Sequence, residues 1–185
     1  MNFEKGVNAL GGNLDYHRLD GLVIHQFRSK LGVTNLKLFA GLSSGTAPIW
    51  KNFEIAGHNE KSPDHWDSNI NTPSNLGLAT MPSGTFFADK FVAFRVSQKL
   101  PLRFRTLGKR YSTIELEYQS AIGAFKNRTD HQFEFRALDH YYQEVGLVWN
   151  RFLGRNFGVG FSYRLGHYQT PEFKDNFGIK LKLGL

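Results

Sequence analysis

The segment FKDNFGIKLKLGL, residues 173–185, alternates strictly between apolar side chains and polar or small ones. Successive side chains of a β-strand point to opposite faces of a sheet, so this alternation predicts a strand with one apolar and one polar face. The apolar face carries Phe177, Ile179, Leu181, Leu183 and Leu185, and the other face carries Asn176, Gly178, Lys180, Lys182 and Gly184. What each face contacts decides which kind of β protein this chain forms.

The same pattern recurs along most of the chain, complete in some segments and interrupted in others. These segments are 15–28, 33–43, 85–99, 113–125, 142–152 and 155–168. Strong helical periodicity is absent, apart from a short turn expected near 136–141. Together with the last segment they predict seven strands of an all-β, antiparallel fold. Residues 44–84 are rich in Pro, Ser, Asn and Gly and predict a long loop.

The composition excludes several classes of protein. The 185 residues include no cysteine, which rules out disulfides, thiolate catalysis and cysteine-bound zinc. The net charge is +7, but the basic residues are dispersed, unlike those of a typical nucleic-acid interface. No apolar segment approaches the roughly 20 residues of a membrane-spanning helix, and no secretory signal follows Met1. A membrane protein of this sequence would therefore be a β-barrel, with any export signal encoded ahead of Met1.

Two kinds of β-barrel show such alternation. A soluble, lipocalin-like barrel turns its apolar face inward around a ligand, whereas a transmembrane barrel turns it outward to lipid. The polar faces of the last strands are short of charge for a soluble surface, and the strands reach the roughly 10 residues that cross a bilayer. Aromatic residues near the strand ends fit an interfacial girdle: Trp149, Tyr163, Tyr168 and Phe173. The sequence therefore predicts a transmembrane barrel, with the soluble ligand-binding barrel as the alternative.

The end of the chain resembles the C-terminal strand of bacterial outer-membrane barrels. In that strand a polar residue, a glycine and two hydrophobic residues occupy characteristic positions, which are filled here by Asn176, Gly178, Leu181 and Leu183. Leu185 departs from the pattern, because such proteins usually end on an aromatic residue. The resemblance implies a bacterial outer-membrane location, a surrounding of outer-membrane lipid and recognition by the barrel-assembly machinery.

Three further segments resemble a Bacteroidetes outer-membrane family: APIWKNFEIAGHN (47–59), LGLATMPSGTFFADKFVAF (76–94) and YYQEVGLVWNRFL (141–153). Members of this family often carry a carboxypeptidase-regulatory-like N-terminal domain. The family is related to the bacterial surface antigen superfamily, which includes outer-membrane insertases and two-partner secretion pores. The resemblance implies that residues 1–185 form the C-terminal seven or so strands of a larger, sixteen-stranded type of barrel, with the N-terminal strands missing. A complete barrel of eight strands is a third reading.

In that superfamily the sixth extracellular loop folds back into the lumen, where an Arg-Gly-aromatic tip contacts inward-facing acids. The resemblance places the 44–84 loop in this position, on the extracellular or lumenal side. The stretch FEIAGHNE keeps the glycine as Gly57, with Ala56 in place of the arginine and His58 in place of the aromatic residue. We therefore expect Gly57 to approach the barrel wall closely and His58 or Lys61 to face the inward carboxylates. These carboxylates are Glu115, Glu117 and Glu144.

Catalytic and metal chemistry have little support in the sequence. Residue types that bind zinc occur at His58, Glu60, Asp64, His65 and Asp67, but without the spacing of a helix-borne site. A barrel phospholipase would need serine and histidine within hydrogen-bond reach, whereas Ser162 and His167 have opposite parity on their strand. The sequence predicts a non-catalytic component that acts in assembly, translocation or surface structure of the outer membrane. No cofactor, metal or nucleic-acid partner is expected.

Overall fold

The computed structural model describes residues 1–7, 14–54, 56–58, 70–71, 77–82, 84–105, 111–126, 134–151 and 157–183. These residues form β-strands joined by turns and by three short 3₁₀ helices. The 3₁₀ helices are η2 (Ile49–Lys51), η5 (Gly166–Tyr168) and η6 (Phe173–Asn176). In this part of the chain no helix has the length and apolar character needed to cross a membrane.

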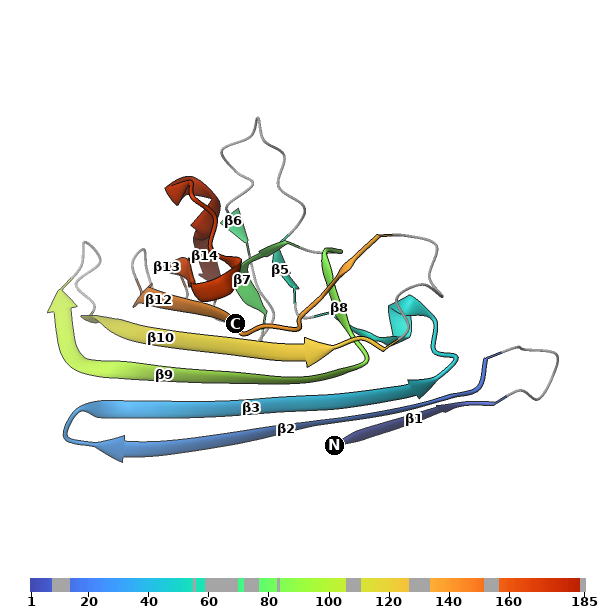
Figure 1. The fold of residues 1–185 in the computed structure, drawn as a ribbon. Coiled ribbons are helices and arrows are strands. Elements are labelled where there is room, and N and C mark those ends of the chain that lie inside the picture. The colour runs from blue at the N-terminus through green and yellow to red at the C-terminus, as the bar shows by residue number, and fades with distance from the viewer. Residues whose placement is uncertain are drawn as a thin grey trace.

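Nine strands form one large sheet in the order β1-β2-β3-β9-β10-β12-β13-β14-β6 (Figure 1). The strands are β1 (Asn2–Gly6), β2 (Tyr16–Ser29), β3 (Gly32–Gly45), β9 (Lys90–Arg105), β10 (Tyr111–Ala124), β12 (Tyr142–Asn150), β13 (Phe157–Leu165), β14 (Phe177–Leu183) and β6 (Ile70–Asn71). All neighbours pair antiparallel except β14 and β6, which pair parallel. The prediction of an all-β fold with a large antiparallel sheet is confirmed.

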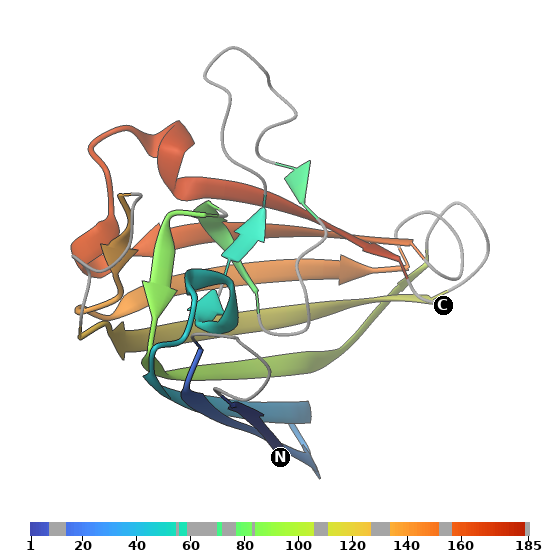
Figure 2. The same ribbon diagram turned by 90° about the vertical axis from the view of Figure 1, so that its right-hand side faces the viewer.

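Two small sheets lie on one side of the large sheet, within its curve (Figures 1 and 2). One contains β4 (Phe53–Glu54), β8 (Phe86–Ala88) and β11 (Arg136–Ala137), and the other contains β5 (Ala56–His58) and β7 (Leu78–Pro82). Four strands, β4 to β7, therefore belong to the segment 44–84, which the sequence predicts as one long loop.

The two ends of the large sheet differ in the length of their connections. Lys30 and Leu31 alone join β2 to β3. Gly32, next to this turn, has a φ of 111°, and a Cβ there would lie 2.0 Å from the carbonyl oxygen of Lys99, so only glycine fits. We call this the short-turn end. The segment 46–89 connects β3 to β9 at the opposite end, the long-loop end.

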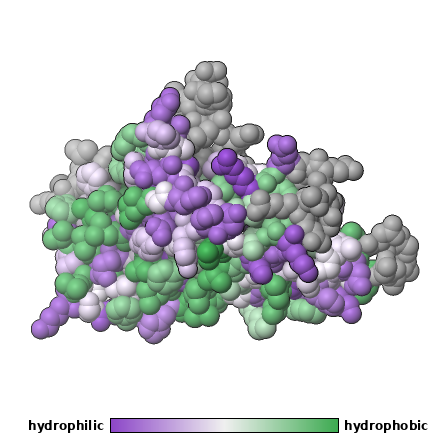
Figure 3. Space-filling model, viewed as in Figure 1, coloured by the Kyte–Doolittle hydropathy of each residue, from purple (hydrophilic) through white to green (hydrophobic). Residues whose placement is uncertain are grey.

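The two faces of the large sheet differ in chemistry. Apolar side chains that remain exposed on the outer face include Leu38, Val92, Phe94, Leu116, Val145, Leu147 and Phe161. Leu147 and Phe161 are paired across β12 and β13 and are 38% and 40% exposed. On the inner face, Glu144 and Lys180 are only 1% and 5% exposed. Figure 3 shows hydrophobic surface, interspersed with hydrophilic patches, along the lower part of the molecule where Figure 1 places β2 and β3.

An apolar cluster joins the inner face to the small sheets near the long-loop end. Its buried members are Phe53, Leu78, Met81, Phe86, Ala88, Phe91, Ala93, Ala121, Leu138 and Tyr142. The ring of Phe91 contacts two others, with centroid distances of 4.8 Å to Phe39 and 4.7 Å to Phe53. Burial of these rings packs β4 against the large sheet, and Phe86 and Ala88 bring β8 into the same cluster.

The strand expected at 85–99 is divided at Asp89. The backbone N–H of Asp89 donates to the carbonyl oxygen of Ala124 (2.9 Å), and its Oδ2 accepts a hydrogen bond from the Lys126 N–H (2.8 Å). These two bonds fix the point at which the chain leaves the small sheet as β8 and enters the large sheet as β9. They come from residues more than thirty positions away, so local alternation could not reveal the break.

Strand β9 runs further than expected, through Pro101 to Arg105. Its pairing with β3 ends at Lys99, opposite Val33, and its pairing with β10 shifts register between Thr113 and Glu115. Proline is tolerated at an edge or an irregularity because no ladder hydrogen bond needs its missing N–H. The sequence pattern also missed β1, and the turn expected at 136–141 begins instead with the two-residue strand β11.

The large sheet does not close on itself within the described residues. Strand β1 pairs with Tyr16–Asp20 of β2, and β14 pairs with β13 and β6, but β1 and β14 do not pair with each other. Residues 21–29 of β2 pair with β3 only. The sheet is therefore an open, curved wall with β1 along one margin (Figure 2).

Two glycines on neighbouring strands test the difference between the faces. A Cβ on Gly41 would lie 2.5 Å from Phe53 and 2.7 Å from Phe91, whereas a Cβ on Gly21 would meet nothing within 4 Å. We expect Gly41→Ala to lower the free energy of unfolding by about 1–3 kcal/mol, because it overpacks the apolar cluster. Gly21→Ala, the matched control, should lower it far less. Urea unfolding followed by tryptophan fluorescence measures both, and equal effects would contradict this packing.

Candidate functional site

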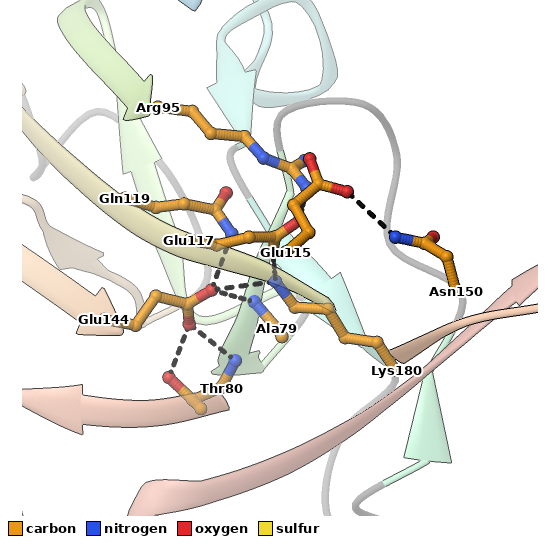
Figure 4. Close-up of polar contacts among 9 residues, drawn as sticks. All are labelled: Ala79, Thr80, Arg95, Glu115, Glu117, Gln119, Glu144, Asn150 and Lys180. Carbon is orange, nitrogen blue, oxygen red and sulfur yellow. Dashed lines mark hydrogen bonds and ion pairs between the residues drawn. The ribbon is translucent and has the colours of Figure 1, made fainter. Parts of the chain in front are cut away.

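The middle of the inner face carries a row of polar residues from four neighbouring strands. Arg95 of β9 pairs with Gln119 of β10, Gln119 with Glu144 of β12, and Glu144 with Arg164 of β13. Since paired residues share a face, the alternation of each strand brings all four side chains to the same side. Strand β7 lies against this row, and Figure 4 shows the contacts of Ala79 and Thr80 with Glu144.

Glu144 binds the backbone of β7 directly. Its Oε1 accepts hydrogen bonds from the N–H of Ala79 (2.8 Å) and from Nε2 of Gln119 (3.1 Å). Its Oε2 accepts from the N–H of Thr80 (3.0 Å) and from the Thr80 hydroxyl (2.9 Å). Four donors thus converge on one buried carboxylate, which is the arrangement that a charged group needs when water is excluded.

The carbonyl oxygen and the hydroxyl group of Thr80 also have partners on the large sheet. The guanidinium group of Arg164 donates through Nη2 to the carbonyl oxygen of Thr80 and through Nη1 to that of Tyr168 (3.3 Å). The Thr80 hydroxyl lies 3.1 Å from the hydroxyl of Tyr142, and the Arg164 guanidinium lies 5.3 Å from the Tyr142 ring centroid. The N–H, hydroxyl and carbonyl of one residue are therefore all bound by the inner face of the sheet.

A second buried carboxylate, that of Glu117, pairs with two cationic side chains beside Glu144. Glu117 accepts a hydrogen bond from Nη2 of Arg95 and another from Nζ of Lys180 (2.9 Å). The Lys180 ammonium also lies 3.7 Å from Oε1 of Glu144. Two cations thus face two carboxylates, and an uncompensated charge at this depth would be strongly unfavourable. We call Arg95, Glu117, Glu144 and Lys180, with Thr80, the inner ion cluster.

Glycine makes room for β7 at the end of the cluster. A Cβ on Gly178 of β14 would lie 3.0 Å from the carbonyl oxygen of Ala79 and 3.2 Å from the side chain of Thr80. The absence of a side chain at this position lets β7 sit close to β14. A larger residue would lift Ala79 and Thr80 away from Glu144.

The structure places the predicted carboxylates on the inner face, and Glu117 and Glu144 belong to the inner ion cluster. Glu115 is also buried and accepts a hydrogen bond from Nδ2 of Asn150 (3.2 Å). The loop residues that reach Glu144 are Ala79 and Thr80, some twenty positions beyond the Gly57 and His58 expected from the resemblance. The backbone of Gly57 and His58 lies in β5, which pairs with β7. The side chain of His58, and all of Lys61, lie outside the described part.

The four positions of the C-terminal pattern have distinct structural roles. The buried side chain of Asn176 accepts a hydrogen bond from the N–H of Thr170 (2.8 Å) and donates to the carbonyl oxygens of Thr170 (2.7 Å) and Glu172 (2.9 Å). These bonds hold the turn before β14. Gly178 provides the close approach described above. Leu181 and Leu183 pair with the outer-face residues of β13, at Val159 and Phe157.

Residues considered for other chemistry do not come together. Ser162 is buried on the inner face, whereas His167 lies in η5, with its ring stacked 3.8 Å from that of His140. The described residues contain no group of three or more His, Asp or Glu side chains that could hold a metal ion. Of the zinc-compatible residues, Glu60, Asp64, His65 and Asp67 lie outside the described part.

Sequence reasoning missed the partners of the carboxylates. These are Ala79, Thr80, Arg95, Gln119 and Lys180, while Arg164 binds the carbonyl oxygen of Thr80. The last four lie at alternate positions of their strands, on the same face as the glutamates, and this was an available signal. Ala79 and Thr80 gave none, because they form hydrogen bonds through backbone groups that every residue carries.

Comparison of the chain with protein-family models, with curated proteins and with solved structures finds no match. The candidate function therefore depends on the chemistry of the two faces and of the inner ion cluster.

Replacing the central carboxylate tests whether it holds β7. Glu144→Gln leaves one acceptor oxygen and places an N–H group opposite backbone N–H groups. We expect the opening free energy of the Ala79 and Thr80 amides to fall by about 1–3 kcal/mol. Hydrogen exchange at these two amides measures the change, which should be about a fivefold or greater acceleration. Glu172→Gln, at an exposed ion pair with Lys174, is the control for loss of one charge. Unchanged exchange in Glu144→Gln would show that the carboxylate does not hold β7.

Proposed function

We propose that this chain is part of a non-catalytic, transmembrane β-barrel of the bacterial outer membrane. Its large sheet forms a segment of the barrel wall, with the outer face toward lipid and the inner face toward the lumen. Strand β7 and its neighbours fill the lumen beside this wall. The role is in assembly, translocation or surface structure of the outer membrane.

The observation that carries the proposal is the inverted distribution of side chains between the faces. Leu147 and Phe161 are exposed near the middle of their strands, while Glu117, Glu144 and Lys180 are buried. A soluble protein gains its stability by the opposite arrangement, since burying apolar surface is favourable and burying charge is not. Lipid around the outer face removes this conflict, because it covers apolar side chains.

The resemblance of the C-terminal residues to an outer-membrane signal strand supports the same proposal. Asn176 stabilises the turn before the strand, and Gly178 admits β7 to the lumen side. These two positions of the pattern thus have a structural role in the sheet that we propose as part of a barrel wall. The proposed relatives are the Bacteroidetes family with a carboxypeptidase-regulatory-like domain and, more distantly, the surface antigen superfamily.

A soluble lipocalin-like barrel is the second candidate, because an apolar cluster does lie on the inner face. That cluster is confined to the long-loop end and is already filled by residues of the chain itself, among them Phe53, Met81 and Phe86. The middle of the inner face is occupied by the inner ion cluster. A ligand-binding barrel with an apolar interior needs the reverse, so the distribution favours the membrane candidate.

Detergent partition tests the orientation of the faces. In a detergent that separates from water on warming, we expect the chain to enter the detergent phase. Leu147→Lys combined with Phe161→Lys should shift it at least tenfold toward water, since a lysine on the lipid face costs about 2–4 kcal/mol at mid-bilayer. Recovery of the unaltered chain in buffer without detergent would contradict a membrane location.

A matched control adds the same two charges elsewhere. Leu31 in the β2–β3 turn and Trp50 in η2 are both exposed, and they lie outside the outer face of the sheet. Leu31→Lys combined with Trp50→Lys should leave partition nearly unchanged. Equal shifts by the two double variants would show that the outer face has no special contact with the apolar phase.

The open margins of the sheet give a separate prediction. Lipid does not tolerate unpaired strand edges, and in the described residues β1 does not pair with β14. We therefore expect the isolated chain to form no closed pore. Planar-bilayer recordings should show no unitary conductance, and reproducible single-channel steps from the purified chain would contradict the prediction.

A further inference from the structure

A concave apolar site lies on the outer face near the long-loop end. It has a volume of about 820 Å³ and is lined chiefly by Leu19, Gly21, Leu38, Ala40, Leu42 and Val92. Neighbouring strands place Gly21, Ala40 and Val92 side by side in one cross-strand row. We call this site the outer groove. Its volume is within the range of roughly 300–1,000 Å³ that is usual for small-molecule sites.

The groove exists because small residues are flanked by large ones. Gly21 and Ala40 form its floor, and leucines on the same strands form its walls. A Cβ added at Gly21 would meet nothing within 4 Å, so the space above this residue is unfilled by the protein. A flat wall touches an acyl chain on one side only, whereas a groove lined by leucines surrounds it and buries more of its surface.

The side chain of Lys90 lies at the rim of this apolar site. Lys90 is the first residue of β9, is exposed, and pairs with Leu42 of β3 and Ala124 of β10 on the outer face. In the described part of the chain its ammonium group has no ion-pair partner. A lysine on a lipid-facing wall is stable near the interface, where its ammonium reaches the headgroups.

We propose that the outer groove binds an anionic, phosphate-bearing lipid. One acyl chain lies over Gly21 and Ala40, and the phosphate pairs with Lys90. The charge of Lys90 selects the anionic headgroup, and the shape of the groove selects an extended apolar chain. This inference rests on the proposed function, because the groove meets lipid only if the outer face does.

Native mass spectrometry of the chain released from mixed micelles tests the site. The micelles contain equal amounts of phosphatidylglycerol and phosphatidylcholine with identical acyl chains. We expect the unaltered chain to retain the anionic lipid about fivefold more than the zwitterionic one, the contribution of one lysine near an anionic headgroup. Lys90→Gln should bring this ratio to about one. Gly21→Leu should lower retention of both lipids, since its side chain fills the groove.

Lys30→Gln, at the short-turn end, is the matched control and should leave the ratio unchanged. Excess inorganic phosphate should displace neither lipid, because the acyl chain supplies much of the binding. A Lys90→Gln ratio equal to that of the unaltered chain, or unaltered retention by Gly21→Leu, would overturn the proposal. So would a dimer that Gly21→Leu dissociates, since the groove would then hold a second copy of the chain.

The outcomes separate this inference from the proposed function. Recovery of the chain in water without detergent would contradict both the proposed function and the lipid site. The unaltered chain could enter the detergent phase while its Lys90 and Gly21 variants retain lipid normally. This result would contradict only the lipid site in the outer groove.

Discussion

The hydrogen bonds between the Glu144 carboxylate and the backbone of Ala79 and Thr80 are the constraint on which the rest of the inner side depends. A carboxylate at this depth requires compensation, and Lys180 and Glu117 extend the compensation across three strands. Once the inner face is committed to these charges, the period of two along each strand directs the apolar side chains outward. The polar inner face and the apolar outer face are therefore two results of a single pattern.

The strand alternation could be predicted because it is local. It gave the antiparallel sheet, the parity of Glu117, Glu144 and Lys180, and most strand boundaries to within a few residues. It could not give the contacts of the inner side. The hydrogen bond from Thr80 to Glu144 joins residues 64 positions apart, and the break at Asp89 depends on Lys126, 37 positions away. Such contacts are decided by which backbone groups remain unpaired after the sheet forms, and this is a property of the whole fold.

The resemblance predicts loop contacts to the inward carboxylates at residues other than Ala79 and Thr80, which bind Glu144. It expected the 44–84 segment to contact inward acids through Gly57 and His58, and the contact that the structure describes is made at the other end of that segment. The physical reason is that a glutamate binds backbone N–H groups as readily as a cationic side chain. Ala56 stands where the resemblance would place an arginine, and the guanidinium group of Arg164, on β13, binds the carbonyl oxygen of Thr80.

The free margin of β2 adds a requirement that lipid cannot meet. Residues 22–29 of this strand are exposed on both faces, and their outer edge has no paired strand in the described residues. Lipid can cover the side chains of the outer face, but it offers no donor or acceptor to backbone N–H and C=O groups. Under the proposed function this edge therefore needs another β-strand, and the antiparallel pairing of β1 with the first part of β2 shows the geometry that such a strand would continue. Under that proposal lipid covers the outer face and a further strand pairs with the edge, and a larger barrel would supply both.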